Sequence, residues 1–271
     1  MEAFIFQTSM RGGKEHMKKN TIQIIIGAVL FALGLTAVIL TRKAGIAEDA
    51  TGAEQALFSI SLIGLLLGAL VIATAFMKPA RTMDVKILTM TAMMAALCYI
   101  AFAFFKIDIP VPGSIEKTAF HLGNTFCVLA ALLLGGIWGG LSGAIGMTIA
   151  DLLSGYVTSA PKTFLLKLCI GLITGLVAHR LLKIDSETDK KKVVWKTAVS
   201  ASAGMLFNVI ADPIVGYFYK RYLFGLQQDL AKALAKISAV TTLVNAVIAV
   251  IAASIFYYAL RPVVRRILKN E

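Results

Sequence analysis

Long apolar runs constrain this chain more than any other feature of its sequence. Eight of them lie near residues 21–41, 56–77, 85–105, 119–134, 137–157, 161–182, 194–218 and 234–260. A helix needs roughly 20 such residues to cross a bilayer. Only 15% of the residues are charged, and the mean hydropathy is +0.80. We therefore predict an all-α integral membrane protein with eight spans.

The basic residues indicate how the chain is oriented. The formal net charge is +12, which in a soluble protein would favour a nucleic-acid partner. With the N-terminus in the cytoplasm, seventeen Lys and Arg residues fall in cytoplasmic segments and nine on the opposite side. Because positive charge gathers on the cytoplasmic side, we predict that both termini are cytoplasmic. We expect contact with anionic membrane lipid and no nucleic-acid partner.

The cysteines and the first apolar run have simple interpretations. Cys98, Cys127 and Cys169 lie inside predicted spans without a close pair, so we expect small buried residues and neither a disulfide nor a metal site. The first run resembles a signal peptide. No small-residue cleavage site follows it, and a second span comes soon after, so we expect a retained span.

The chain divides into three regions. Residues 1–20 form a polar tail, residues 21–80 an accessory transmembrane hairpin almost free of polar side chains, and residues 81–271 a six-helix membrane core. Within the core, the external segment 106–120 contains two prolines and a glycine, so we expect an irregular loop that acts as a lid or wall. The segment 220–236 is amphipathic, which favours an interfacial helix.

Glycines spaced four apart predict close packing of helices. Small residues at this spacing let two helix backbones approach closely in lipid. Such pairs are Gly136 with Gly140, Gly139 with Gly143, and Gly171 with Gly175.

Polar side chains inside spans are costly in lipid and are candidates for function. Asp151 and Lys167 each lie six residues from the facing ends of neighbouring spans, which predicts an ion pair at similar depth. The pair can brace two helices, touch a polar solute, or do both. The complete set is His121, Asn124, Asp151, Lys167, His179, Asn208, Asp212 and Asn245.

Two similar stretches, "IADLLSGY" and "IADPIVGY", each place an aspartate and a tyrosine near the outer end of a span. We expect Asp151 to brace the helices and Asp212, with Asn208 and Tyr217, to contact a solute. The chain has no His-Glu-x-x-His, Gly-x-Gly-Asp or Walker A motif and no paired Ser/His arrangement, so no enzyme is predicted.

The stretch "HLGNTFCVLAALLLGGIWGGLSGAIGMTIADLLSGY", followed by "APKTFLLKLCIGLITGL", resembles the substrate-binding S component of energy-coupling-factor (ECF) vitamin transporters, riboflavin-type group. The resemblance is strong over 121–176 and weaker over 85–260. It implies a multi-pass protein of the cell membrane that binds riboflavin, pyridoxine, hydroxymethylpyrimidine or pantothenate outside the cell.

The resemblance also implies partners. It implies docking on a coupling membrane protein driven by two ATP-binding-cassette ATPases, which use the ATP, while the chain itself needs no catalytic cofactor. An Ala-x-x-x-Ala patch, here Ala92 and Ala96, would form the docking surface. The expected substrate-binding residues are Pro110, Val111, Gly113, His121, Asn124, Lys162, Asn208, Asp212, Tyr217 and Asn245.

Some features depart from the family pattern. The N-terminal hairpin is additional, a Gln expected near Ile248 is absent, and the segment 219–222 is basic, which favours a ligand with a carboxylate or phosphate. Two alternatives stay open at this point. One is a proton-coupled transporter that uses Asp151 and Asp212, and the other is an intramembrane enzyme in which the two aspartates hold a metal.

Overall fold

The computed structural model describes residues 25–29, 32–33, 36, 84–111 and 117–269. The chain divides into two units, Met1–Lys78 and Pro79–Glu271, and each is described by itself. In the first unit the described residues are helical. Most of the predicted polar tail and accessory hairpin lies outside the described residues.

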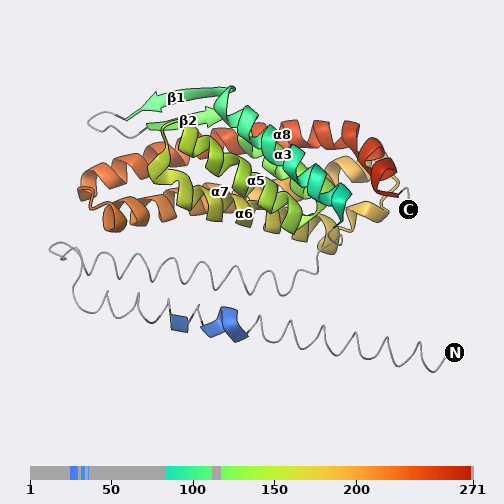
Figure 1. Cartoon of the computed structure of the whole chain (residues 1–271), viewed down its shortest axis with the longest axis horizontal. Helices are drawn as coiled ribbons and strands as arrows, with labels where there is room; N and C mark the ends of the chain where they lie inside the picture. Colours follow the sequence, from blue (N-terminus) through green and yellow to red (C-terminus); the bar gives the residue numbers. More distant parts are fainter. Residues whose placement is uncertain (1–24, 30–31, 34–35, 37–83, 112–116, 270–271) are drawn as a thin grey trace. The chain divides into compact units, whose positions relative to one another are not determined.

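The second unit is a bundle of six helices with a small β-hairpin at one end and the C-terminus at the other (Figure 1). Short 3-10 or π segments extend or join several of the helices. The helices and strands are α3 (Val85–Ala103), β1 (Lys106–Pro110), β2 (Lys117–His121), α4 (Gly123–Leu134), α5 (Gly136–Leu153), α6 (Ala160–Gly175), α7 (Lys190–Phe218) and α8 (Gln228–Lys269).

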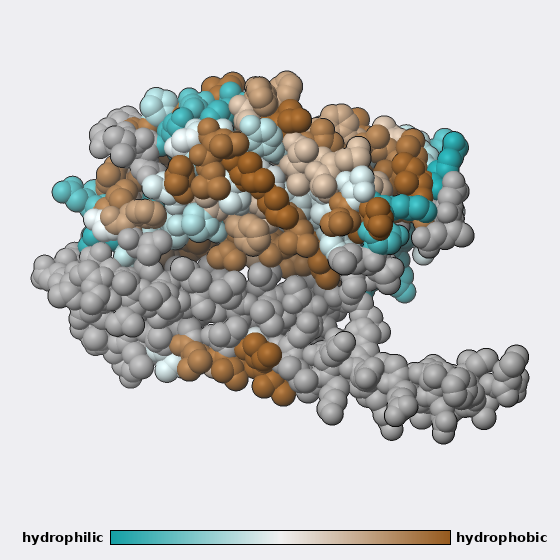
Figure 2. All heavy atoms as spheres, viewed as in Figure 1, coloured by the Kyte–Doolittle hydropathy of each residue, from teal (hydrophilic) through white to brown (hydrophobic). Residues whose placement is uncertain are grey.

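Five of the described helical segments are long and apolar enough to cross a membrane, which confirms an α-helical membrane core. Their outward faces carry large apolar side chains such as Leu88, Leu206 and Val247, each more than half exposed. Figure 2 shows hydrophobic atoms across the middle of this unit and hydrophilic atoms toward its two ends. This distribution suits a protein surrounded by lipid.

Helix α4 is shorter than the predicted span 119–134. It has 12 residues, about 18 Å of helix, and so does not reach across a hydrocarbon core of about 30 Å. All its residues except Phe126 are buried. Gly135, at φ 92°, ends the helix and lets α5 begin at once. The bundle is thus built around a short central helix.

The glycine pairs pack helices together as predicted. A Cβ atom at Gly171 would overlap the backbone of Gly140, and one at Gly175 would overlap the backbone of Gly136. A Cβ at Gly139 would likewise overlap Ala131 of α4. Helices α4, α5 and α6 therefore touch through their backbones, which fixes how α5 and α6 align along their lengths.

The external segment 106–120 is more ordered than expected. Its described residues form two antiparallel strands in which Asp108 pairs with Ala119 and Ile109 with Thr118. The segment 220–236 is not a separate interfacial helix, because its residues from Gln228 onward are the first turns of α8. Both changes give the hairpin end of the bundle more regular structure than predicted.

At the opposite end, the charged segment between α6 and α7 is fixed by α8. Arg261 donates to the backbone carbonyls of Ile184 and Glu187 at 2.8 and 2.6 Å. Glu187 also pairs with Lys196 at 2.8 Å.

Candidate functional site

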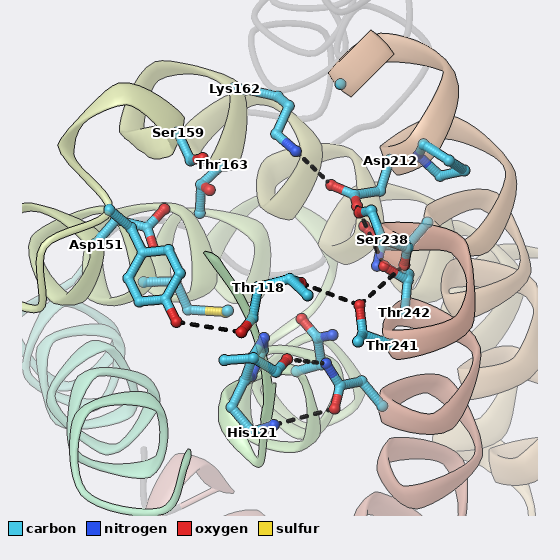
Figure 3. Close-up of a pocket in the computed structure, with 18 of the residues that line it drawn as sticks. Thr118, His121, Asp151, Ser159, Lys162, Thr163, Asp212, Ser238, Thr241 and Thr242 are labelled. Atoms are coloured by element: carbon cyan, nitrogen blue, oxygen red, sulfur yellow. Dashed lines mark hydrogen bonds and ion pairs between the residues drawn. The ribbon is translucent and has the colours of Figure 1, made fainter. Parts of the chain in front are cut away.

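A cavity of about 100 Å³ lies beneath the β-hairpin, between β2 and the halves of α5, α6, α7 and α8 that lie toward the hairpin. Its walls mix apolar surface with hydroxyl, amide and charged side chains. Figure 3 shows Asp151 and Asp212 on opposite walls of the cavity, with Thr118 and Thr241 lower in this view.

Asp212 of α7 joins three helices. Lys162 of α6 donates to Oδ1 at 2.8 Å, while Ser238 and Thr242 of α8 donate to Oδ2 at 2.5 and 3.1 Å (Figure 3). The Lys162 and Asp212 side chains are 10% and 14% exposed. Both carboxylate oxygens are therefore engaged within the protein, which makes Asp212 a cross-brace.

The β2 strand is held against α8 by side chains of the cavity. Asn245 accepts from the His121 backbone N–H and donates to the Ala119 carbonyl, each at 3.0 Å. Thr118 and Thr241 exchange a hydrogen bond at 3.0 Å. The Asn245 amide thus satisfies backbone hydrogen-bonding groups at the edge of β2, as a neighbouring strand would.

His121 faces the cavity in a defined protonation state. The Gly123 N–H donates to its Nδ1 at 3.2 Å, which places the ring proton on Nε2. Burial, followed by the charge of Lys167, lowers the pKa of His121 to about 3. Its ring packs on Phe102 with centroids 4.6 Å apart. The imidazole is therefore a neutral donor beside an aromatic wall.

Tyr156 connects the β-hairpin to the loop after α5. Its hydroxyl donates to Asp108 Oδ1 at 2.7 Å, and Lys117 pairs with Asp108 Oδ2 at 2.8 Å. The ammonium groups of Lys106 and Lys117 lie 5.1 and 4.8 Å from the centre of the Tyr156 ring. We call Asp108, Lys106, Lys117 and Tyr156 the latch.

The latch carries a charged carboxylate at neutral pH. Burial opposes ionisation of Asp108, but hydrogen bonds from Lys117 and Tyr156 outweigh it and lower the pKa of the carboxyl group. Burial, with the hydrogen bond to Asp108, raises the pKa of Tyr156. The phenol therefore keeps its proton and can donate.

Asp151 and Lys167 line the cavity but do not form the ion pair that we predicted. No contact within 4.0 Å joins their charged atoms, although the structure describes both residues fully. Lys167 donates instead to Asn208 Oδ1 at 3.5 Å. Asp151 Oδ2 is buried and has no hydrogen-bond partner.

The alignment of α5 and α6 explains the difference. Gly140 lies opposite Gly171, and Gly136 lies opposite Gly175. Asp151 is eleven residues beyond Gly140, whereas Lys167 is only four residues before Gly171. The seven-residue offset corresponds to about 10 Å along the helices. The predicted pairing assumed equal depth, which the glycine contacts exclude.

Most of the predicted polar residues meet at the cavity. Those that line it are His121, Asn124, Asp151, Lys162, Lys167, Asn208, Asp212 and Asn245. Of the others, Pro110 is exposed on β1, Val111 is buried outside the lining, and Tyr217 packs against Phe218. Gly113 lies outside the described residues.

Sequence reasoning missed the hydroxyl groups of the site. The additional lining residues with hydroxyls are Thr118, Tyr156, Ser159, Thr163, Ser238, Thr241 and Thr242. The repeated Ser/Thr positions on α8, three and four residues apart, place hydroxyls on one helix face and were an available signal.

A comparison with models of known protein families shows to which family the chain belongs. The model of the family described as "ECF-type riboflavin transporter, S component" matches residues 82–262, which run from just before α3 into the last part of α8 and include the whole cavity lining. The comparisons with curated proteins and with solved structures gave no match.

The chain therefore belongs to the ECF S-component family, riboflavin-transporter type. It is a membrane-embedded protein of a transporter family rather than a member of an enzyme class.

Proposed function

We propose that this protein is the substrate-binding subunit of an ECF-type importer and captures a vitamin or vitamin precursor on the outer side of the membrane. The observation that carries the proposal is the cavity under the β-hairpin, because it lies within the matched region and is lined by hydrogen-bonding side chains. Riboflavin is the first candidate ligand, ahead of pyridoxine, hydroxymethylpyrimidine and pantothenate.

The size of the cavity supports a site that opens and closes. Sites for small organic ligands usually measure about 300–1,000 Å³, and the present cavity measures about 100 Å³. Entry of a vitamin therefore requires the hairpin to move outward. The hydrogen bond between Asp108 and Tyr156 in the latch is the contact that such a movement would break.

A second surface suits the proposed membrane partner. Ala92 and Ala96 are exposed on α3 and border an apolar groove of about 430 Å³ between α3 and α5. Gly146 and Ile149 of α5 form its other side. Small residues four apart let a partner helix approach closely, so we propose that the coupling protein, which is driven by two ATPases, docks here.

Native mass spectrometry of the purified full chain, expressed without added vitamins and then titrated with the four candidates, tests the proposal. We expect one adduct of vitamin mass with one-to-one stoichiometry. Absence of any adduct over the whole panel would contradict it.

Transport assays separate this function from proton-coupled transport. We expect vesicles that contain this chain alone to accumulate no vitamin, and accumulation to require the coupling protein, its ATPases and ATP. Accumulation by the chain alone that an uncoupler abolishes would support the proton-coupled alternative instead.

A further inference from the structure

Two buried charged groups on the cavity wall lack the partners that buried charges need. The Asp151 residue is 3% exposed and the Lys167 residue 6% exposed. Asp151 Oδ2 accepts no hydrogen bond. Lys167 makes one long contact, to Asn208 at 3.5 Å, although an ammonium group has three donors. A buried charge without partners costs several kcal/mol. A bound ligand that hydrogen-bonds to both groups would remove this cost.

The neighbouring side chains do not satisfy these groups. Asp212, the other carboxylate in the cavity, already accepts from Lys162, Ser238 and Thr242. Thr163 hydrogen-bonds to the Asp151 carboxylate (Figure 3), yet Oδ2 stays without a donor. The cavity therefore presents one free acceptor from α5 and one underused donor from α6.

The wall beside these charges is aromatic. The Phe102 ring lies 4.6 Å from His121 and 5.7 Å from Tyr156, centroid to centroid. All three residues line the same cavity as Asp151 and Lys167. Aromatic faces favour a planar ligand, and two opposite charges that balance one another favour an uncharged one.

We propose that Asp151 and Lys167 together read the polar edge of a planar, uncharged heterocycle. A ring N–H of the ligand donates to Asp151 Oδ2, and a ring carbonyl accepts from Lys167 Nζ. The ligand thus takes the place of the ion pair that the helix alignment prevents. This inference rests on the proposed vitamin-binding function and identifies which side chains set its specificity.

Riboflavin and N3-methylriboflavin provide the test, because they differ only in the N–H between two ring carbonyls. Hydrogen bonds to charged groups contribute enough for the full-length wild-type protein to bind riboflavin about 10- to 100-fold more tightly than the methylated compound. In Asp151→Ala this preference should fall to about twofold. In Lys167→Met both ligands should bind more weakly and the preference should persist.

Matched controls and a stability measurement make the result specific. Asp229→Asn and Lys232→Met change the same charges at exposed positions of α8, and they should leave both affinities unchanged. Asp151→Ala should keep or raise the melting temperature, because it removes a buried charge that has no ion-pair partner. If the alanine variant does not fold, Asp151→Asn, which keeps the side-chain shape, replaces it in the test. Its preference for riboflavin over N3-methylriboflavin should lie between those of the wild type and about twofold.

The outcomes separate this inference from the proposed function. Equal weakening of both ligands by Asp151→Ala would overturn the role of Asp151 as the N–H acceptor. Binding of pyridoxine or pantothenate without binding of either flavin would overturn the inference and leave the vitamin-binding function intact. Failure of every vitamin to bind would overturn both.

Discussion

Substitution of Asp212 distinguishes a structural brace from a ligand contact. Asp212→Asn keeps the side-chain shape and an oxygen that can accept from Ser238 and Thr242. It removes the charge opposite Lys162, which lies 2.8 Å from Oδ1. We expect the variant to lose stability because the Lys162 ammonium stays largely buried without a counter-charge.

The magnitude follows from the burial of the pair. Removing one partner of a fully buried pair costs about 3–5 kcal/mol, whereas an exposed pair contributes about 0–1 kcal/mol. The Lys162 and Asp212 side chains are 10% and 14% exposed, close to the buried limit. We therefore expect a loss of about 3 kcal/mol. For a domain of this size that corresponds to a fall in melting temperature of about 6–12 °C.

Thermal unfolding of purified protein in one detergent, without ligand, measures this effect. Lys162→Met should also lower the melting temperature, and the double variant should recover about half of the summed loss, since neither charge is then left alone. Additive losses, or a normal melting temperature for Asp212→Asn, would refute the brace. A fall in affinity without a fall in stability would return Asp212 to the role of a ligand contact.

Three further substitutions probe the helix packing, the latch and the groove. Gly171→Ala should prevent accumulation of folded protein, measured by size-exclusion chromatography, because its Cβ would overlap the Gly140 backbone. Tyr156→Phe should speed ligand release several-fold at pH 7 in stopped-flow measurements. Because the pKa of Asp108 is lowered in the folded protein, wild-type release should be slow above about pH 4 and speed up below it, as the carboxylate gains its proton. Ala96→Trp should leave vitamin binding unchanged but block co-purification with the coupling protein, whereas Ile100→Trp, at an exposed position of α3 outside the groove, should not.

The helices were predictable because their signal is strong and repeated. An apolar run of about 20 residues has few stable forms in lipid, so α3 and α5 to α8 were expected near their observed places. Close helix packing at Gly140 and Gly171 was also expected, since the small-residue spacing has a direct steric meaning, but the spacing did not show that these two glycines face one another. The fourth apolar run, 119–134, was already the shortest, but hydropathy could not show that α4 has only 12 residues, because a helix buried in protein and a helix exposed to lipid are equally apolar.

The sequence gives weaker signals for the β-hairpin and for the hydroxyl side chains that line the cavity. Segment 106–120 contains prolines that disfavour helix, but its strand pairing depends on the anchoring of β2 by Asn245, 124 residues from His121 in the chain. Thr241 was overlooked because a threonine in a helix often bonds to its own backbone. In this protein the Thr241 hydroxyl donates to the backbone carbonyl of Ser238, and it also forms a hydrogen bond with the Thr118 hydroxyl.

In our proposal the two aspartates have the reverse of the roles that the sequence predicted, for a reason that lies in helix alignment. Asp151 and Lys167 have a spacing across the turn that suggests equal depth, yet the Gly140–Gly171 contact shifts them about 10 Å apart along the helices. Asp212 has no such obstacle, because Lys162 lies at its level on α6 and pairs with it. Both carboxylates line the cavity, and the steric contact between glycines thus explains why Asp212 is paired within the protein while Asp151 has no ion-pair partner. A substitution that fills the glycine contact should therefore alter ligand recognition as well as packing. In any such variant that still folds, a changed preference for riboflavin over N3-methylriboflavin would measure that link.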